Sequence, residues 1–253
     1  MSSIQTHVSA DEWSARVEVA ACYRLVHHYG MTDMVYNHIS GRVPGTEHLL
    51  INAYGYLYDE IRASNLIKID LDGNIVGPHE DPHGYGLNQA GIVIHTAVHK
   101  ARENVGCVIH THTRAGMAVS AQAQGLLPLT QTAMRFYGHL GYHDYEGPAL
   151  DVAEQARLVA DLGEHSAMIL RNHGLLAAGP SVAEAFNTLY WLEMACKAQI
   201  DALAGGGGLH TPPEEVRRKT ALMYQPRTRG PFGLREWPAM LRLLDRIDPS
   251  YRE

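Results

Sequence analysis

The first 204 residues alternate helix signals with short apolar runs, and this alternation restricts the fold more than any other feature of the chain. Three helix starts show Ser or Asp followed three residues later by Glu, which is the pattern of a capping box. We expect the first of these helices to end at Gly30 and the last to end near Leu203. A fourth helix fits residues 88–102, where apolar residues recur at helical spacing. The three capped starts are Ser9, Asp151 and Ser181.

Short apolar runs lie between the helices, and each has the length of a strand and ends at a polar residue or glycine. They cover residues 49–51, 66–69, 105–109 and 167–170. Residues 71–74, Leu-Asp-Gly-Asn, follow one of these runs and predict a hairpin turn. Strands that are joined both by hairpins and by helices predict a mixed sheet covered by helices, an α/β sandwich of layers.

A composition break separates the end of the chain from its body. Residues 205–208 are four glycines, and Pro212 and Pro213 follow, so we expect a flexible linker over 205–213. We expect one domain over 1–204 with a net charge of −9, and an arm over 214–253. Residues from 209 onward have a net charge of +3, so the arm is predicted to pack on the acidic body or on a neighbouring subunit. A frayed tail is the alternative, and the apolar residues of the arm disfavour it.

Composition excludes several classes of protein. The formal net charge is −6, which argues against a dedicated nucleic-acid binder. No apolar run approaches the length of a membrane span, and the polar N-terminal residues give no signal for export. Cys22, Cys107 and Cys196 lie far apart in apolar contexts, as free thiols of a reducing compartment do. We therefore expect a cytoplasmic protein that binds neither nucleic acid nor membrane.

Residues 108–112 form the sharpest functional signal, an apolar strand that ends in His-x-His. Side chains two apart on a strand point to the same face, so His110 and His112 project together at a spacing that suits one metal ion. A second apolar strand runs into His173. Two strand ends of one sheet could bring three imidazoles together, a set that suits Zn²⁺, Fe²⁺, Mn²⁺ or Co²⁺. The alternative is that these histidines are hydrogen-bonded core or turn residues.

Other histidines compete for the role of ligand. His95 and His99 lie four apart on one helix face, which is also a metal spacing, but no glutamate stands between them as in zinc proteases. We expect His95 to pack beneath the sheet, and most of the remaining pairs, such as His139 and His143, to be solvated. The sequence has no nucleophile elbow, Walker loop or Gly-x-Gly-x-x-Gly after a strand, so esterase and nucleotide-binding functions are unsupported.

Four motifs in order along the chain resemble those of the class II aldolase/adducin family, in particular its adducin-like bacterial branch. They are YNHISGR at 36–42, INAYG with YDEI within 51–61, GCVIHTH at 106–112 and LRNHG at 170–174. The resemblance covers about residues 15–204. It implies a three-layer αβα sandwich around a mixed, largely antiparallel sheet, in a homotetramer with active sites at subunit interfaces. It also implies that His110, His112 and His173 bind a divalent metal, zinc first, with Mn, Fe or Co as alternatives.

The chain departs from the family's aldolases just before the fourth predicted helix. Those aldolases carry a Ser-Ser-Glu triplet there, whose Glu binds metal and serves as acid and base. The Glu position is Gly91 in this chain, and the two serines that help to hold a substrate phosphate fall at Gln89 and Ala90. This loss argues against a standard sugar-phosphate aldolase. A carboxylate from elsewhere, for instance Glu80 or Asp81, could stand in for the missing one.

The resemblance also suggests residues for substrate and proton transfer. It places a catalytic tyrosine near Tyr142, whose phenol suits protonating an alkoxide or enolate better than removing a proton. It implies substrate contacts for Asn37, Ser40, Gly55 and Gln89. Five further polar residues could line the site, with no order of preference among them: Tyr85, Arg114, Arg135, His143 and Asp144.

We expect a divalent-metal-dependent carbon–carbon lyase, of aldolase or decarboxylase type, that acts on a small, unphosphorylated hydroxy or keto acid through a metal-stabilised enolate. A decarboxylase can start without a base and needs only an acid to quench the carbanion, which fits the missing carboxylate at Gly91. Two alternatives stay open. One is a non-haem Fe(II) oxygenase that uses the three histidines, and the other is a non-catalytic, adducin-like binding protein.

Overall fold

The computed structural model describes residues 4–79, 81, 83–147 and 153–253, and within them seven strands form a single sheet in the order β3-β2-β1-β4-β7-β6-β5. Neighbouring strands run antiparallel throughout, except that β5 and β6 are parallel. The predicted mixed, largely antiparallel sheet is therefore confirmed. The strands are β1 (His38–Arg42), β2 (Leu49–Asn52), β3 (Leu66–Ile69), β4 (Cys107–Thr111), β5 (Gly141–His143), β6 (Ala167–Leu170) and β7 (Gly174–Gly179).

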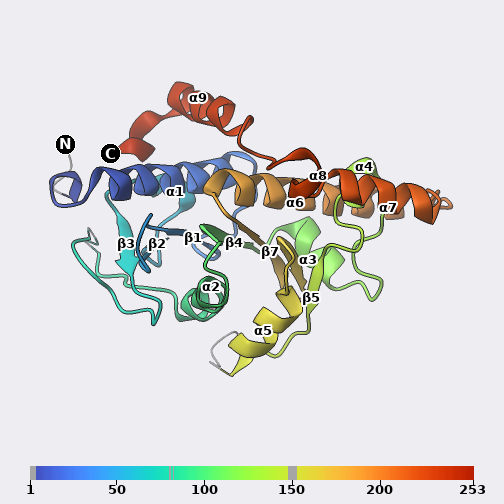
Figure 1. Cartoon of the computed structure of the whole chain (residues 1–253), viewed down its shortest axis with the longest axis horizontal. Coiled ribbons are helices and arrows are strands. Elements are labelled where there is room, and N and C mark those ends of the chain that lie inside the picture. The colour runs from blue at the N-terminus through green and yellow to red at the C-terminus, as the bar shows by residue number, and fades with distance from the viewer. Residues whose placement is uncertain (1–3, 80, 82, 148–152) are drawn as a thin grey trace.

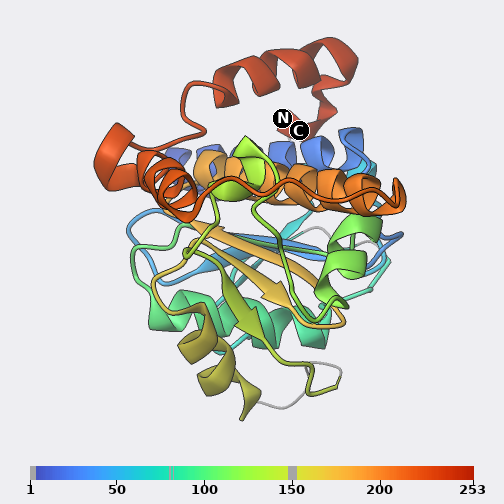
Figure 2. The same cartoon turned by 90° about the vertical axis from the view of Figure 1, so that its right-hand side faces the viewer.

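Helices cover both faces of the sheet and complete the expected three-layer αβα sandwich (Figures 1 and 2). The long helices α1 and α6 lie on one face, and α2 and α5 lie on the other (Figure 2). The helices are α1 (Ala10–His28), α2 (Gln89–Ala101), α3 (Arg114–Ser120), α4 (Gln131–Met134), α5 (Glu154–Leu162), α6 (Val182–Ala204), α7 (Glu214–Met223), α8 (Pro226–Arg229) and α9 (Trp237–Ile247), with 3₁₀ turns at Ile4–Thr6, Tyr58–Glu60 and Pro249–Arg252.

The two faces of the sheet bury two separate apolar clusters. Ile109 and Ile169 point toward α1 and α6, whereas Val108 and Leu170 point toward α2 and α5. This alternation follows from the pleat, which sends successive side chains to opposite faces. Every residue of β4 is buried, so its two faces are both covered by helices. Side chains of β4 therefore have a defined layer, and a residue at 110 must share the α2 layer with Val108.

Helix starts agree with the sequence pattern in two of three cases. The hydroxyl of Ser9 accepts from the backbone N–H of Glu12 and begins α1, and the hydroxyl of Ser181 accepts from the N–H of Glu184 and begins α6. The Glu12 carboxylate does not close the capping box, because it pairs with Arg16 and Lys68. Helix α5 begins at residue 154, and the third predicted cap, Asp151, lies outside the described residues.

Three strands were not predicted, and each has a weak strand pattern. β7 reads Gly-Leu-Leu-Ala-Ala-Gly and forms because it lies between β4 and β6, and β5 has only three residues. β1 contains His, Ser and Gly, so its residues do not show the alternation of apolar and polar side chains that marks a strand. The turn predicted at 71–74 does form, with Asp70 accepting from two backbone N–H groups, but it leads only to an isolated bridge between Ile69 and Ile75.

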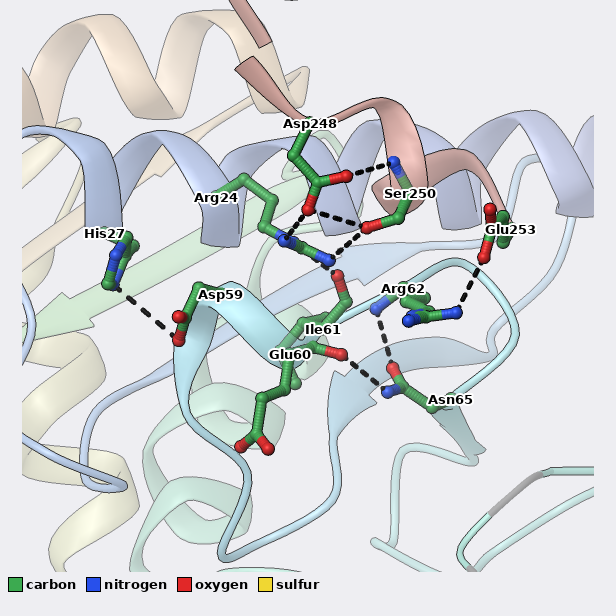
Figure 3. Close-up of polar contacts among 10 residues, drawn as sticks. All are labelled: Arg24, His27, Asp59, Glu60, Ile61, Arg62, Asn65, Asp248, Ser250 and Glu253. Atoms are coloured by element: carbon green, nitrogen blue, oxygen red, sulfur yellow. Dashed lines mark hydrogen bonds and ion pairs between the residues drawn. The ribbon is translucent and has the colours of Figure 1, made fainter. Parts of the chain in front are cut away.

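The C-terminal residues return to the body of the same chain (Figure 1). The Arg24 guanidinium donates to Asp248 and to Ser250, each at 3.0 Å, and also to the carbonyl of Ile61 (Figure 3). The backbone N–H of Ser64 donates to the main-chain oxygen of Glu253. Helix α9 and the turn at Pro249–Arg252 thus lie over α1, whereas α7 packs against α4. Within the described part of the chain, no helix is long and apolar enough to cross a membrane.

Candidate metal centre

Three imidazoles meet where β4 ends and where β6 turns into β7. Nε2 of His112 lies 2.9 Å from Nε2 of His110 and 3.0 Å from Nε2 of His173. His110 is buried, and the other two are half-buried. The structure thus brings together the three histidines that the sequence pattern selects, because antiparallel pairing sets the end of β4 beside the start of β7.

The Nδ1 hydrogen bonds determine which nitrogens face the centre. Nδ1 of His110 donates to the carbonyl of Leu175 at 2.9 Å, and Nδ1 of His112 donates to the carboxylate of Asp33 at 3.1 Å. A neutral imidazole that carries its hydrogen on Nδ1 has its lone pair on Nε2. Two lone pairs therefore face each other at 2.9 Å, which is repulsive unless a cation lies between them. A carbonyl or carboxylate behind each ring is the usual support of a ligating histidine.

The donor set fits a divalent ion. Burial holds the pKa of His110 well below its ordinary value and lowers the pKa of His173 to about 4, so both rings are neutral at pH 7 and can donate a lone pair. The ligand nitrogens of the three rings all lie within 4.8 Å of one another, so one ion could be shared among them. Three neutral imidazoles leave positions for water and substrate, and they accept several first-row metals.

Asn37 holds the backbone beneath the centre. Its side-chain oxygen accepts from the backbone N–H of His112 at 2.9 Å, and its φ of +74° is in the left-handed region that asparagine tolerates better than most residues. Asn37 is buried, and its Nδ2 has no partner among the described residues. We expected a substrate contact from Asn37, and in the structure its oxygen positions His112.

Gly91, which stands at the position of the missing carboxylate, is covered by a histidine ring. A Cβ at Gly91 would lie 2.6 Å from Cδ2 of His38. His38 pairs with His110 across β1 and β4, so both rings face the α2 layer. The sequence interpretation missed His38 because it did not predict β1. The available signal was the spacing of two between His38 and Ser40, which sets both on one face of a strand.

The other expected substrate-binding residues lie in different surroundings. Ser40 is fully buried, and its hydroxyl oxygen lies 2.6 Å from Nδ1 of His95, a residue that packs beneath the sheet as expected. Gly55 has a φ of +101° and is backed by the ring of Tyr85. Gln89 is exposed in the first turn of α2. In the described part of the chain, no hydrogen bond joins Ser40, Gly55 or Gln89 to the three histidines.

Tyr142 faces the layer of α6. It is the register partner of Ile169, and its hydroxyl accepts from the backbone N–H of Leu126 at 3.0 Å while its ring lies under the guanidinium of Arg171. The next residue, His143, pairs with Leu170 and therefore points to the opposite face. The structure does not bring Tyr142 beside the three histidines of its own chain.

A small cleft of about 10 Å³ lies beside His173. His143 lines this cleft. We expected its side chain to be solvated, but the structure buries it. Its two ring nitrogens contact the carboxylates of Asp161 at 2.7 Å and Glu154 at 3.3 Å. The ring of Tyr145 also lines the cleft, 6.2 Å from the ring of His173 between centroids.

The remaining polar residues that we expected near the site lie in different places. Asp81 accepts from the backbone N–H of Gly86, and Glu80 lies outside the described residues, so no stand-in for the missing carboxylate is seen there. Asp144 lines the cleft beside His173. The guanidinium of Arg135, in contrast, stacks against aromatic rings between α6 and the C-terminal segment.

Comparisons with known proteins show what the chain is similar to. The sequence model described as the class II aldolase and adducin N-terminal domain matches residues 17–200. A Pseudomonas aeruginosa protein with a provisional class 2 aldolase name is 47% identical and covers 99% of this chain and 96% of its own length. Rat α-adducin is 38% identical over 92% of this chain, which spans 33% of that longer protein. The crystal structure of an aldolase II superfamily protein from Pseudomonas syringae superposes with a TM-score of 0.92 at 51% identity, over the whole of both chains.

Proposed function

Since the chain belongs to the class II aldolase and adducin family, we propose that it is a divalent-metal-dependent carbon–carbon lyase of the aldolase or decarboxylase type. The observation that supports this proposal most is the meeting of three imidazole Nε2 atoms, two of which carry lone pairs. We propose a small, unphosphorylated hydroxy or keto acid as substrate. Gln89 and Ala90 stand where the family's aldolases have the serines that help to hold phosphate, and Gly91 offers no carboxylate.

The residues of the centre have separate tasks in this proposal. His110, His112 and His173 would hold the ion, zinc first and manganese, iron or cobalt as alternatives. A bound divalent ion would polarise oxygen atoms of the substrate and stabilise the negative charge that develops when a carbon–carbon bond breaks. Asp33 keeps the ring of His112 oriented, and Asn37 fixes the backbone at the same residue.

A tyrosine is the proposed donor of the proton that the cleaved carbon must receive. Tyr145 lines the cleft beside His173, and a phenol carries a hydrogen that it can donate. Tyr142, the residue that the sequence pattern favours, faces α6 and is held by Leu126 and Arg171. We therefore propose Tyr145 as the donor within one chain and keep Tyr142 as the alternative.

The likeness to α-adducin favours one competing function, a binding protein without catalysis. The hydrogen bonds of the centre weigh against it, since a binding surface has no need of two imidazoles whose lone pairs face each other. An Fe(II) oxygenase is the other alternative that the donor set allows. We also propose a homotetramer in the cytoplasm, the latter supported by three free, buried cysteines.

Elemental analysis of the protein purified without chelator or metal-binding tag tests the proposal. We expect about one divalent ion per chain in the wild type and a loss of most of it in His110→Ala. His210→Ala is the matched control, because His210 is exposed in the linker, and it should keep the wild-type content. No metal in the wild type, even after zinc, manganese or iron is added back, would overturn the enzyme proposal.

The nature of the reaction is tested by product formation without oxygen. A lyase loaded with zinc or manganese should release product from small hydroxy and keto acids under nitrogen at the same rate as in air. Activity that needs both iron and oxygen would replace the lyase by the oxygenase.

A further inference from the structure

A chain of hydrogen bonds runs through the interior from α2 to the strand beside the metal centre. Nδ1 of His99 lies 3.2 Å from the carbonyl oxygen of Val105, and Nε2 of His99 lies 2.8 Å from the hydroxyl of Ser40. The same hydroxyl lies 2.6 Å from Nδ1 of His95, and Nε2 of His95 lies 3.0 Å from Nδ1 of His38. Each of the three rings and the serine is at most 4% exposed.

The direction of every bond follows from Val105, because a backbone carbonyl only accepts. His99 therefore donates from Nδ1 and, when neutral, has its lone pair on Nε2. The hydroxyl of Ser40 must donate to that lone pair, which leaves its oxygen to accept from Nδ1–H of His95. His95 then accepts at Nε2, and the hydrogen of that bond comes from Nδ1 of His38. A neutral His38 consequently carries no hydrogen on Nε2.

The neutral state that this reasoning needs is supported by burial. Removal from water lowers the pKa of both His95 and His99 to about 3, so these two rings are uncharged at pH 7. An imidazole is mostly uncharged at that pH even in water, and His38 is taken in the same state. The Val105 carbonyl can only accept, so it fixes the direction of every hydrogen bond in the series. Rotating the Ser40 hydroxyl therefore does not change the tautomers of the three rings.

The lone pair of His38 lies beside the metal centre and has no donor. The rings of His38 and His110 are 5.2 Å apart between centroids, on one face of the antiparallel pair. Nε2 lies over Gly91, at 3.0 Å from the place that a Cβ of residue 91 would take. Among the described residues, no hydrogen bond ends on this nitrogen, although His38 is only 4% exposed. An acceptor lone pair beside the centre is free to take a hydrogen bond from a molecule bound there.

We propose that Nε2 of His38 accepts a hydrogen bond from a hydroxyl group of the substrate held at the three-histidine centre. This role rests on the proposed function, since it needs a substrate at that centre. A hydroxyl supplies the missing hydrogen, whereas a keto or ether oxygen at the same place would set one lone pair against another. His38 therefore selects a hydroxy acid over the corresponding keto acid, and Ser40 acts as a positioning residue that keeps the tautomer.

The tautomers can be read in the metal-free protein, independently of any activity. Long-range ¹H–¹⁵N correlation spectra at pH 7 should show that His38, His95 and His99 all carry hydrogen on Nδ1 and none on Nε2. A His38 that is protonated on Nε2 would overturn the inference and leave the proposed metal centre intact.

Ligand selectivity tests the role itself. The probes are glycolate and methoxyacetate, which share a carboxylate and an α-oxygen but differ in the hydroxyl hydrogen. The zinc-loaded wild type should bind glycolate about two- to tenfold more tightly by calorimetric titration, the range that one net hydrogen bond gives. His38→Asn keeps a donor near Nδ1 but removes the Nε2 acceptor, so it should bind the two probes equally.

Controls separate the possible failures. His210→Asn, the same change at an exposed position, should keep the wild-type preference, and the zinc content of His38→Asn reports that the centre has folded. An equal preference in wild type and His38→Asn would overturn the role of His38 alone. A wild type that binds neither zinc nor glycolate would overturn this inference together with the proposed function.

Discussion

Ser40 is the residue on which the buried network depends, because its single hydroxyl serves two rings. Replacing it by alanine leaves Nδ1–H of His95 and Nε2 of His99 buried without a partner. We expect Ser40→Ala to lower the free energy of unfolding by about 2 kcal/mol, since each orphaned buried group costs free energy. Urea denaturation measures this change.

The matched control for Ser40→Ala is Ser14→Ala, an exposed position in α1. It should change the free energy of unfolding by less than about 0.5 kcal/mol. A similar, small effect at both positions would mean that the hydroxyl of Ser40 contributes little to the network.

The two tyrosines near the end of β5 give a paired test of proton transfer. Tyr145→Phe removes the phenol beside His173, and we expect kcat to fall about a hundredfold or more, as for loss of a general acid. Tyr142→Phe loses the hydrogen bond from Leu126, so it should cost about 1 kcal/mol of stability and change kcat only a few-fold. Steady-state kinetics and urea denaturation of both variants measure these effects. A large fall in kcat for Tyr142→Phe and a small one for Tyr145→Phe would identify Tyr142 as the proton donor.

Helix α2 makes the stability of the metal-free protein depend on pH. It carries His95 and His99, whose pKa burial lowers to about 3, whereas an unfolded histidine has a pKa of about 6.5. Between these values the unfolded state binds more protons, so stability is complete above pH 6.5 and is lost as the pH falls. We expect the free energy of unfolding, measured with chelator present, to fall by at least about 1 kcal/mol per unit below pH 6. A flat profile from pH 7 to 5 would contradict this.

A second element, the segment that follows the linker, is held to the body through Arg135. Its guanidinium lies 5.2 Å from the ring centre of Trp191 on α6, 4.6 Å from that of Tyr224 and 5.1 Å from that of Phe232. We expect Arg135→Ala to speed trypsin cleavage within α7 several-fold, because loss of these contacts frees the segment. Arg229→Ala is the matched control, because Arg229 is exposed on α8. It should leave the rate of trypsin cleavage within α7 unchanged.

Elements with strong local signals could be predicted from the sequence, and those that depend on neighbours could not. The serine caps locate α1 and α6 within a residue or two. β4 begins and ends two residues beyond the apolar run at 105–109, because its pairing with β7 extends to Thr111. β7 itself has alanines and glycines that favour no strand, and it forms because two strands flank it.

The residues of the candidate site divide in the same way, into those with a local sequence signal and those without one. Strand alternation together with the resemblance selects His110, His112 and His173, and the structure brings them together. His38 was missed because its strand was missed. The placement of Tyr142 depends on where the three-residue β5 ends, a boundary that propensity cannot locate.

At the scale of the whole molecule, the centre draws on parts of the chain that lie far apart. Asp33 precedes β1, His112 follows β4, and His173 precedes β7, so these three strands must be paired before the three imidazoles can meet. The order of the strands, which sets β1, β4 and β7 side by side, is therefore the property that creates the site.

The clamp between Arg24 and the C-terminal segment has a consequence for the order of folding. Arg24 and Asp248 are 224 positions apart along the chain, so their contact closes a very long loop. The entropy cost of closing a loop grows with its length, and a contact between distant residues is favoured only once the intervening chain is compact. We therefore expect α9 and the turn at Pro249–Arg252 to dock on α1 late, after the sheet and its two helical layers have formed.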